Sequence, residues 1–286
     1  MVYRILQARM FALSVIAVLS SFFALSAQTP YKLPPPNIAS VVDSPVFPGV
    51  LPSPTGEMLL LIENKANPSI GLLAEPIVKL AGERINTATN ALQRRVEISG
   101  FTLQSINGKN SVKITVPANS RLGNPVWSPD GSKIAFTRDA AGGMELWVAD
   151  AKTGKASQIQ DVKPVDIFDE PLVWINNKSL LVKAIPPKRG AAPVISPVPQ
   201  GPVVEESIGK LAQVRTYQDL LKNPDDEQLF EYYSTLQLTS VEIATGKTSL
   251  LGEPGLIPSA EFSPNEQYLL VTKLKKPFSY RVTWQE

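Results

Sequence analysis

The chain carries a recurring pattern of short apolar segments, each interrupted by a tight turn. The clearest unit spans residues 126–136 (VWSPDGSKIAF), where an apolar pair precedes Ser-Pro-Asp-Gly and a second apolar run follows. Proline sets φ at the first turn position, and Asp, Asn or Gly tolerates the left-handed conformation that comes next. Each unit therefore predicts a hairpin of two strands. Further copies occupy residues 50–61 and 261–271, and a degenerate copy occupies 173–182.

A second repeated unit is an alternating strand that runs into a Thr-Gly-Lys or Asn-Gly-Lys turn. It is found at residues 145–155 and 238–247, and more loosely at 101–109. Two hairpins per repeat make a four-stranded blade, and the 47 residues from Trp127 to Trp174 are close to the length of one. The pattern predicts an all-β fold, a partial β-propeller with about three blades and the start of a fourth. The predicted blades are residues 50–116, 123–160, 171–251 and 257 onward.

These blades make up an incomplete propeller domain of residues 49–286. Propellers close with four to eight blades, and an open stack of three and a fraction would leave unpaired strand edges. We therefore expect the sequence to be a piece of a longer protein. A complete small propeller of four blades is the alternative.

The third blade is interrupted by an insertion at about residues 185–235. It begins as a loop rich in Pro and Gly and continues as a helical part at about 205–233, where two short helices are expected. The first helix is expected to carry Tyr217, Leu220 and Leu221.

The second helix of the insertion has a clear start. Asn223 suits the N-cap position, Pro224 suits the first helical position, and acidic residues follow in the first turn. Its buried stripe is expected to contain Leu229, Phe230 and Tyr233.

The N-terminal residues 1–27 have the pattern of a signal peptide. Arg4 and Arg9 precede an apolar run, and small residues precede Gln28. Cleavage after Ala27 would leave the rest in the periplasm or outside a bacterium. An uncleaved membrane anchor is the alternative, and it would be the chain's one contact with a membrane. Residues 28–48 contain six prolines and are expected to form an extended leader.

Composition excludes several classes of function. The formal net charge is +2, and apart from Arg4 and Arg9 the remaining 26 Lys and Arg equal the 26 Asp and Glu. A balanced chain lacks the basic face of a nucleic-acid-binding protein. The absence of histidine removes the base of a Ser-His-Asp triad, and the absence of cysteine removes thiolate chemistry. We therefore expect no catalytic residue, cofactor or metal site within the chain.

Two smaller features have simple interpretations. Asp166, Asp169 and Glu170 cluster before a predicted strand without the spacing of a calcium loop, so a solvated loop is favoured over a cation site. Tryptophans recur at the repeat positions 127, 147 and 174, where packing between strands is favoured over stacking on a ligand.

Longer motifs are more specific than the hairpin repeats. They are residues 80–86 (LAGERIN), 125–131 (PVWSPDG), 215–224 (RTYQDLLKNP) and 229–233 (LFEYY). With them the chain resembles the prolyl oligopeptidase clan of serine peptidases, and most closely its glutamyl endopeptidase branch. The resemblance implies an N-terminal propeller that guides peptide substrates to a C-terminal α/β-hydrolase domain with the catalytic triad. The chain matches only the propeller part and has no Gly-x-Ser-x-Gly motif, so no catalytic residue is carried over.

The inserted helices are the best candidates for contacts with a substrate or with the hydrolase domain, because insertions tend to carry function. The residues predicted to make these contacts are Tyr217, Asp219, Phe230 and Tyr233. A purely structural role, in which the helices cover one blade, stays open. For the whole chain, a stand-alone exported propeller that serves as a protein-binding scaffold is the alternative to the peptidase.

Overall fold

The computed structural model describes residues 32–93, 96–195, 198, 201 and 215–286. The chain divides into two compact units, residues 1–44 and 45–286. The predicted signal peptide, residues 1–27, lies outside the described residues, as does the part of the predicted helical insertion at 205–214.

In the first unit the described residues contain one short helix, α2 (Pro36–Val42). The prediction of an extended leader is therefore wrong for this segment. Pro36 lies at the start of the helix, where the missing N–H has no intrahelical partner to lose, and the rest of the helix contains no proline. The prolines thus begin a helix here, although their density predicts extended chain.

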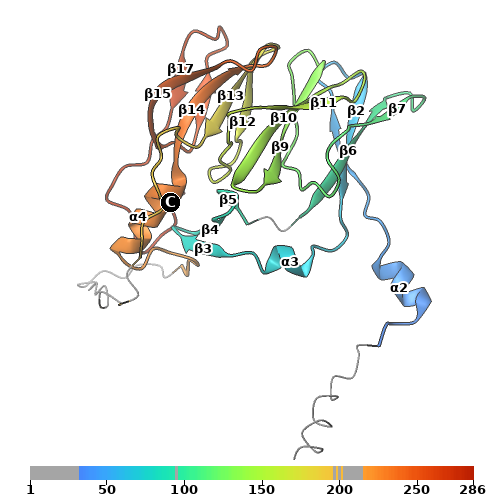
Figure 1. The fold of residues 1–286 in the computed structure, drawn as a ribbon. Helices are drawn as coiled ribbons and strands as arrows, with labels where there is room; N and C mark the ends of the chain where they lie inside the picture. Colours follow the sequence, from blue (N-terminus) through green and yellow to red (C-terminus); the bar gives the residue numbers. More distant parts are fainter. Residues whose placement is uncertain (1–31, 94–95, 196–197, 199–200, 202–214) are drawn as a thin grey trace, which may run out of the picture. The chain divides into compact units, whose positions relative to one another are not determined.

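The second unit is built on antiparallel sheets (Figure 1). Sheet 1 contains β1 (Gly49–Pro52), β2 (Met58–Asn64), β6 (Ile98–Ser105) and β7 (Ser111–Lys113). Sheet 2 contains β8 (Val126–Trp127), β9 (Lys133–Ala140), β10 (Gly143–Asp150) and β11 (Ala156–Ile159). Sheet 3 contains β12 (Leu172–Asn176), β13 (Ser179–Ala184), β14 (Thr235–Glu242) and β15 (Thr248–Leu256). Sheet 4 contains β16 (Ala260–Phe262) and β17 (Leu269–Val271).

The strand order confirms the predicted four-stranded units. In each of these sheets the strands lie side by side in the order in which they occur along the chain, and each strand pairs with the strands next to it. Sheets 1, 2 and 3 coincide with the predicted blades apart from a few residues at the ends, and sheet 4 begins the fourth. The sheets follow one another from right to left in Figure 1. Closure of these sheets into a propeller stays a prediction.

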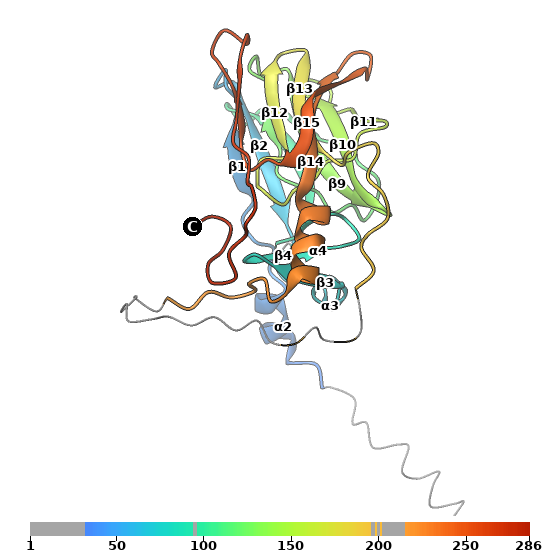
Figure 2. The same cartoon turned by 90° about the vertical axis from the view of Figure 1, so that its left-hand side faces the viewer.

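Long insertions separate the second strand from the third in sheets 1 and 3. The one in sheet 1 contains α3 (Ile70–Leu73) and a small sheet of β3 (Ile77–Leu80), β4 (Glu83–Asn86) and β5 (Ala91–Leu92). Sequence reasoning missed this sheet, because strands of two to four residues are too short to show an alternating pattern. The insertion in sheet 3 contains α4 (Pro224–Ser234), which lies beside β3 (Figure 2).

The second predicted helix of the insertion is confirmed and the first is wrong. Asn223 caps α4 by accepting a hydrogen bond from the Asp226 N–H at 2.8 Å. Residues 215–222 form no helix. Asp219 has φ +57°, and its carbonyl accepts a hydrogen bond from the Gly82 N–H at 3.0 Å. The backbone therefore bonds to the β3–β4 turn and not to its own next turn.

Successive sheets pack face to face because alternate residues of each strand are apolar on opposite sides. Ile134 and Phe136 of β9 join the cluster shared with sheet 1, where the rings of Phe101 and Phe136 lie 5.1 Å apart. Ala135, between them, joins the cluster shared with sheet 3, which includes Leu180. The period-two pattern thus buries both faces of sheet 2.

The Ser-Pro-Asp-Gly turn is held by its serine. The Ser128 hydroxyl accepts a hydrogen bond from the Lys133 N–H at 2.9 Å and donates one to Asp130 at 2.7 Å. Ser53 and Ser263 accept the corresponding bonds from the N–H groups of Met58 and Tyr268. The repeated serine therefore closes the first hairpin of sheets 1, 2 and 4 in the same way.

The turns after β10 and β14 provide a matched pair of glycines. Gly154 has φ +68°, and a Cβ atom there would lie 2.7 Å from the Lys113 carbonyl oxygen. Gly246 has φ +71°, and a Cβ atom there would meet nothing within 4 Å. We expect Gly246→Ala to lower the free energy of unfolding by about 1–2 kcal/mol through the left-handed backbone alone. Gly154→Ala should cost about 1–3 kcal/mol more through the clash. Urea denaturation of both variants measures the difference, and equal losses would contradict the contact between sheets 1 and 2.

Asp130 predicts a pH dependence of stability. Hydrogen bonds from Ser128 and Ser132 lower the pKa of its carboxyl from 3.8 to about 2. A lowered pKa in the folded state stabilises the fold above the unfolded pKa, and this contribution is lost as the pH falls from about 4 to about 2. We expect the difference in unfolding free energy between wild type and Asp130→Asn to be constant above about pH 5 and to shrink toward pH 2. A difference that does not change with pH would contradict the role of the charged hydrogen bonds.

Candidate functional site

In the described part of the chain a pocket lies along the first strands of sheets 1, 2 and 3. It has a volume of about 1060 Å³ and is lined by Gly49 of β1, by Val126 and Trp127 of β8, and by residues 172–174 of β12. Among the described residues, β1, β8 and β12 each lie at the edge of their sheet and pair with one neighbouring strand. The pocket is thus bordered by sheet edges from three successive sheets.

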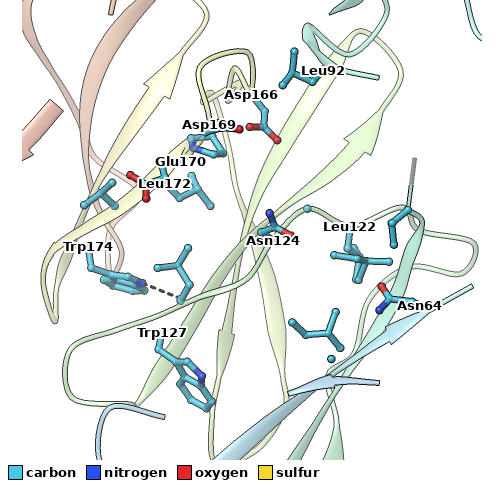
Figure 3. A pocket seen from close by; sticks show the side chains of 18 of the residues that line it. Asn64, Leu92, Leu122, Asn124, Trp127, Asp166, Asp169, Glu170, Leu172 and Trp174 are labelled. Atoms are coloured by element: carbon cyan, nitrogen blue, oxygen red, sulfur yellow. Dashed lines mark hydrogen bonds between the residues drawn. The ribbon is translucent and has the colours of Figure 1, made fainter. Parts of the chain in front are cut away.

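Most of the pocket wall is apolar, and two indoles fix its strands. Trp174 donates a hydrogen bond from Nε1 to the Val126 carbonyl at 3.1 Å, drawn in Figure 3. Trp127 donates in the same way to the Leu51 carbonyl at 3.3 Å. Each tryptophan therefore ties the first strand of its sheet to the first strand of the sheet before. Phe262 stands at this position in sheet 4 and has no such donor.

One side of the pocket is acidic. Asp166, Asp169 and Glu170 come from the loop before β12, and no Lys or Arg is among the described residues that line the pocket (Figure 3). Asp169 and Glu170 have φ +47° and +46°, which side-chain-bearing residues seldom adopt in succession. Such strained backbone persists only where surrounding contacts impose it. The contacts that hold this loop are therefore important for the pocket.

Lys183 of β13 supplies these contacts. Its side chain is 5% exposed, and its ammonium donates to the carbonyls of Phe168, Asp169 and Pro258 at 3.0, 2.8 and 2.6 Å. Its backbone N–H donates to the Pro171 carbonyl, and its carbonyl accepts from the Val165 N–H. Burial lowers the pKa of the Lys183 amine, an effect opposed by the charges of Glu170, Asp169 and Asp166. Lys183 thus binds both ends and the middle of the acidic loop.

A fourth carboxylate, that of Glu83, lies close to the loop. Glu83 of β4 accepts hydrogen bonds from Trp284 Nε1 at 2.9 Å and from Gln285 Nε2 at 2.7 Å. Burial raises the pKa of Glu83; the two hydrogen bonds oppose the rise and the nearby charge of Asp169 adds to it. The indole of Trp284 also contacts Phe168, with ring centres 4.8 Å apart. Residues 284–285 therefore help to position the acidic loop through Phe168 and Glu83.

The predicted contact residues lie away from the lining of this pocket. Asp219 is bound by Arg84 at 2.7 Å and by Lys79 at 3.5 Å, and the Tyr217 ring lies under the Arg215 guanidinium. Burial acts to raise the pKa of Asp219, and the hydrogen bonds and charges of Arg84 and Lys79 together lower it.

The other two predicted residues, on α4, are buried. Phe230 is in the core, with its ring 5.4 Å from that of Phe278, and Tyr233 belongs to the same cluster. Contacts of these four residues with a substrate or a further domain stay a prediction.

Sequence reasoning singled out the acidic loop but not Lys183. The signal for Lys183 is its place inside the apolar run of β13 (SLLVKA), where a charged side chain must find buried partners. Within the described ranges no group of three acidic residues is placed to hold a metal ion, and no helix is long and apolar enough to cross a membrane.

We expect Lys183→Met to lower the free energy of unfolding by about 2–4 kcal/mol, because it leaves three carbonyls without their charged donor. Lys178→Met, in the exposed turn before β13, is the matched control and should change stability by less than about 0.5 kcal/mol. Urea denaturation measures both variants. Equal stability of the two would show that Lys183 does not hold the loop.

Comparison with known proteins identifies two similar chains. The probable glutamyl endopeptidase, chloroplastic, of Oryza sativa subsp. japonica is 34% identical over 272 residues, which are 90% of this chain and 29% of the relative. The protein of the same description from Arabidopsis thaliana is 35% identical over 285 residues, 95% of this chain and 30% of the relative. The chain therefore spans about 30% of the length of these relatives. No family model matches it.

Solved structures show weaker similarity. A putative TolB from Agrobacterium tumefaciens has a TM-score of 0.38 at 13% identity and covers 80% of this chain and 54% of that one. An acylaminoacyl peptidase from Pyrococcus horikoshii has a TM-score of 0.41 at 12% identity, over 78% of this chain and 27% of that one. Scores below 0.5 carry no conclusion about function. The sequence similarity shows homology to the glutamyl endopeptidases over the part of them that the chain spans.

Proposed function

We propose that the chain is the N-terminal, non-catalytic propeller portion of an exported serine peptidase of the glutamyl endopeptidase type. In this proposal it guides peptides to a C-terminal α/β-hydrolase domain that lies outside these 286 residues. The observation that carries it is the identity of 34–35% to glutamyl endopeptidases over 90–95% of the chain, which is only 29–30% of their length. Further domains in these relatives fit the proposed partner domain.

The residues of the chain support a guiding role over a catalytic one. A serine triad needs an imidazole base, and the sequence contains no histidine. What the chain does offer is the pocket bordered by β1, β8 and β12. Main-chain groups at free strand edges can bond to an extended peptide, and apolar walls can bury its side chains. The pocket is therefore suited to the passage or temporary binding of a peptide.

The acidic loop gives this passage a preference. Asp169 and Glu170 line it beside Asp166, and the Lys183 ammonium, which binds the Asp169 carbonyl, compensates part of their charge. Charged clefts raise the local concentration of ligands of opposite charge, and salt weakens the effect. We propose that cationic peptides enter through this side more readily than acidic ones.

The size of the native polypeptide tests the domain proposal. An antibody against residues 45–286 should capture a species much larger than 31.1 kDa that hydrolyses peptides, while the recombinant 286-residue chain hydrolyses none. A native species at or below 31.1 kDa without peptidase activity would overturn the proposal. It would leave an exported protein-binding scaffold as the function to test.

The guiding role predicts a substrate-dependent effect of the acidic loop. In the native full-length protein, Asp169→Asn/Glu170→Gln should lower kcat/KM for a lysine-rich peptide by about tenfold at low salt, and less at high salt. A two-residue reporter substrate should be hydrolysed at the wild-type rate, since it needs no guidance.

Glu57→Gln/Glu253→Gln is the control, because it removes two exposed charges outside the pocket lining. Equal losses for the long peptide and the reporter would show that the loop does not select peptides.

A further inference from the structure

Sheet 4 has the first two strands of the repeated unit in the described part of the chain. The residue before each turn pairs with the start of the second strand: Trp127 with Ile134 in sheet 2, Trp174 with Leu180 in sheet 3, and Phe262 with Leu269 in sheet 4. In sheets 2 and 3 the second strand then pairs with a third, β10 or β14. β17 has the corresponding position in sheet 4, and β16 is its one partner strand among the described residues.

The outer edge of β17 presents main-chain groups that suit a further strand. Ser263 N–H donates to the Tyr268 carbonyl, and Thr272 N–H donates to the Ser259 carbonyl. These bonds enclose the pair Glu261–Leu270, so the N–H and C=O of Leu270 point toward β16. Since successive residues of a strand alternate, the N–H and C=O groups of Leu269 and Val271 point to the outer edge.

An apolar groove lies beside this edge. It has a volume of about 560 Å³ and runs between sheet 3 and sheet 4, with walls that include Leu238, Leu250 and Leu251 on one side and Phe262 and Leu269 on the other. Figure 1 shows β15 and β17 next to each other.

Two large apolar side chains of sheet 4 are exposed to solvent near the groove. Tyr268 is 71% and Leu270 is 73% exposed, whereas Ala135, at the position of Leu270 in sheet 2, is 0% exposed. The face of sheet 4 that carries Leu270 is thus left open, whereas the corresponding face of sheet 2 is covered by sheet 3.

The corresponding space beside sheet 1 is filled by the third and fourth strands of sheet 2, β10 and β11. Ala149 of β10 is buried in the cluster shared by sheets 1 and 2, and Ala156 of β11 packs against it. The groove beside β17 therefore fits two strands with small or branched apolar residues facing Leu238 and Leu251.

The chain after β17 leaves sheet 4. The Trp284 N–H donates to the Ala81 carbonyl at 3.1 Å, so residues 272–286 reach the turn between β3 and β4. In sheets 1 and 3 the chain also leaves the sheet after the second strand. In both sheets it then returns, and the third strand, β6 or β14, pairs with the second. The same course in sheet 4 would need residues beyond 286.

We propose that the outer edge of β17 pairs with an antiparallel strand from residues of a longer polypeptide that follow this chain. The relatives are more than three times as long as the part this chain spans, which supplies the length for such a strand. The proposal shares with the proposed function the premise of a longer polypeptide. It does not depend on peptidase activity or on guidance of peptides.

Hydrogen exchange at single-residue resolution tests the pairing. In the recombinant 286-residue chain the amides of Leu269 and Val271 should exchange rapidly. In the native polypeptide they should be slowed on the order of 100-fold, as paired strand amides are. The amides of Ile134 and Phe136, which have the same positions in sheet 2 and already face β10, are the control and should be protected in both samples.

Each outcome decides the proposal. Rapid exchange of both amides in the native polypeptide would overturn it, as would a native polypeptide no longer than this chain. Protection in the recombinant chain together with a dimer in solution would identify a second copy as the occupant and also overturn it. Loss of peptidase activity in an otherwise longer, protected polypeptide would contradict only the proposed function.

A proline variant gives an independent measure. Val271→Pro removes an outward N–H and spares the bonds to β16, so an edge strand should tolerate it. The Tm of the native polypeptide should fall by several degrees, and the Tm of the recombinant chain should hardly change. Equal shifts in both samples would show that the Val271 N–H has no partner strand.

Discussion

The central sheets of this protein have two apolar faces each, and this constraint governs the rest of the structure. Within β9 the residues Ile134 and Phe136 serve one interface and Ala135 the other, so sheet 2 cannot be buried by a single neighbour. A twisted sheet of this kind is stable only when another sheet lies on each side. Sheet 2 therefore needs both sheet 1 and sheet 3 as neighbours.

Face-to-face packing leaves the edges of the first strands free, and the pocket follows from this. The indole of Trp127 bonds β8 to β1, and the indole of Trp174 bonds β12 to β8. The acidic loop is placed at this edge because it precedes β12 directly. Lys183 holds the loop residues Asp169 and Glu170, which have positive φ. Its buried ammonium donates hydrogen bonds to three carbonyl oxygens. The second and third strands of sheets 1, 2 and 3 are paired on both edges, while the first strands border the pocket.

The sequence predicts the parts of this fold that repeat. Ser128 and Ser263 recur with the same turn chemistry, and that repetition locates the hairpins of sheets 2 and 4 without any long-range information. The cap at Asn223 likewise depends on neighbours in the chain, so the sequence predicts it correctly. The sequence does not predict the conformation around Asp219, because Gly82 and Arg84, more than a hundred residues earlier, set it. The pocket could not be predicted for the same reason, since it joins edges of three sheets that lie far apart in the sequence.

Lys183 connects the pocket with the open side of the unit. Its ammonium binds the carbonyls of Phe168 and Asp169 in the acidic loop and also that of Pro258, in the connection to sheet 4. A movement of sheet 4 would therefore disturb one of the three acceptors and change the balance of forces on the strained loop. The strand that completes sheet 4 would fix this connection, so it would also fix the position of Asp169 and Glu170 in the pocket. The proposed selection of peptides by the loop would then depend on the longer polypeptide, and isolated residues 1–286 should hold the loop less firmly.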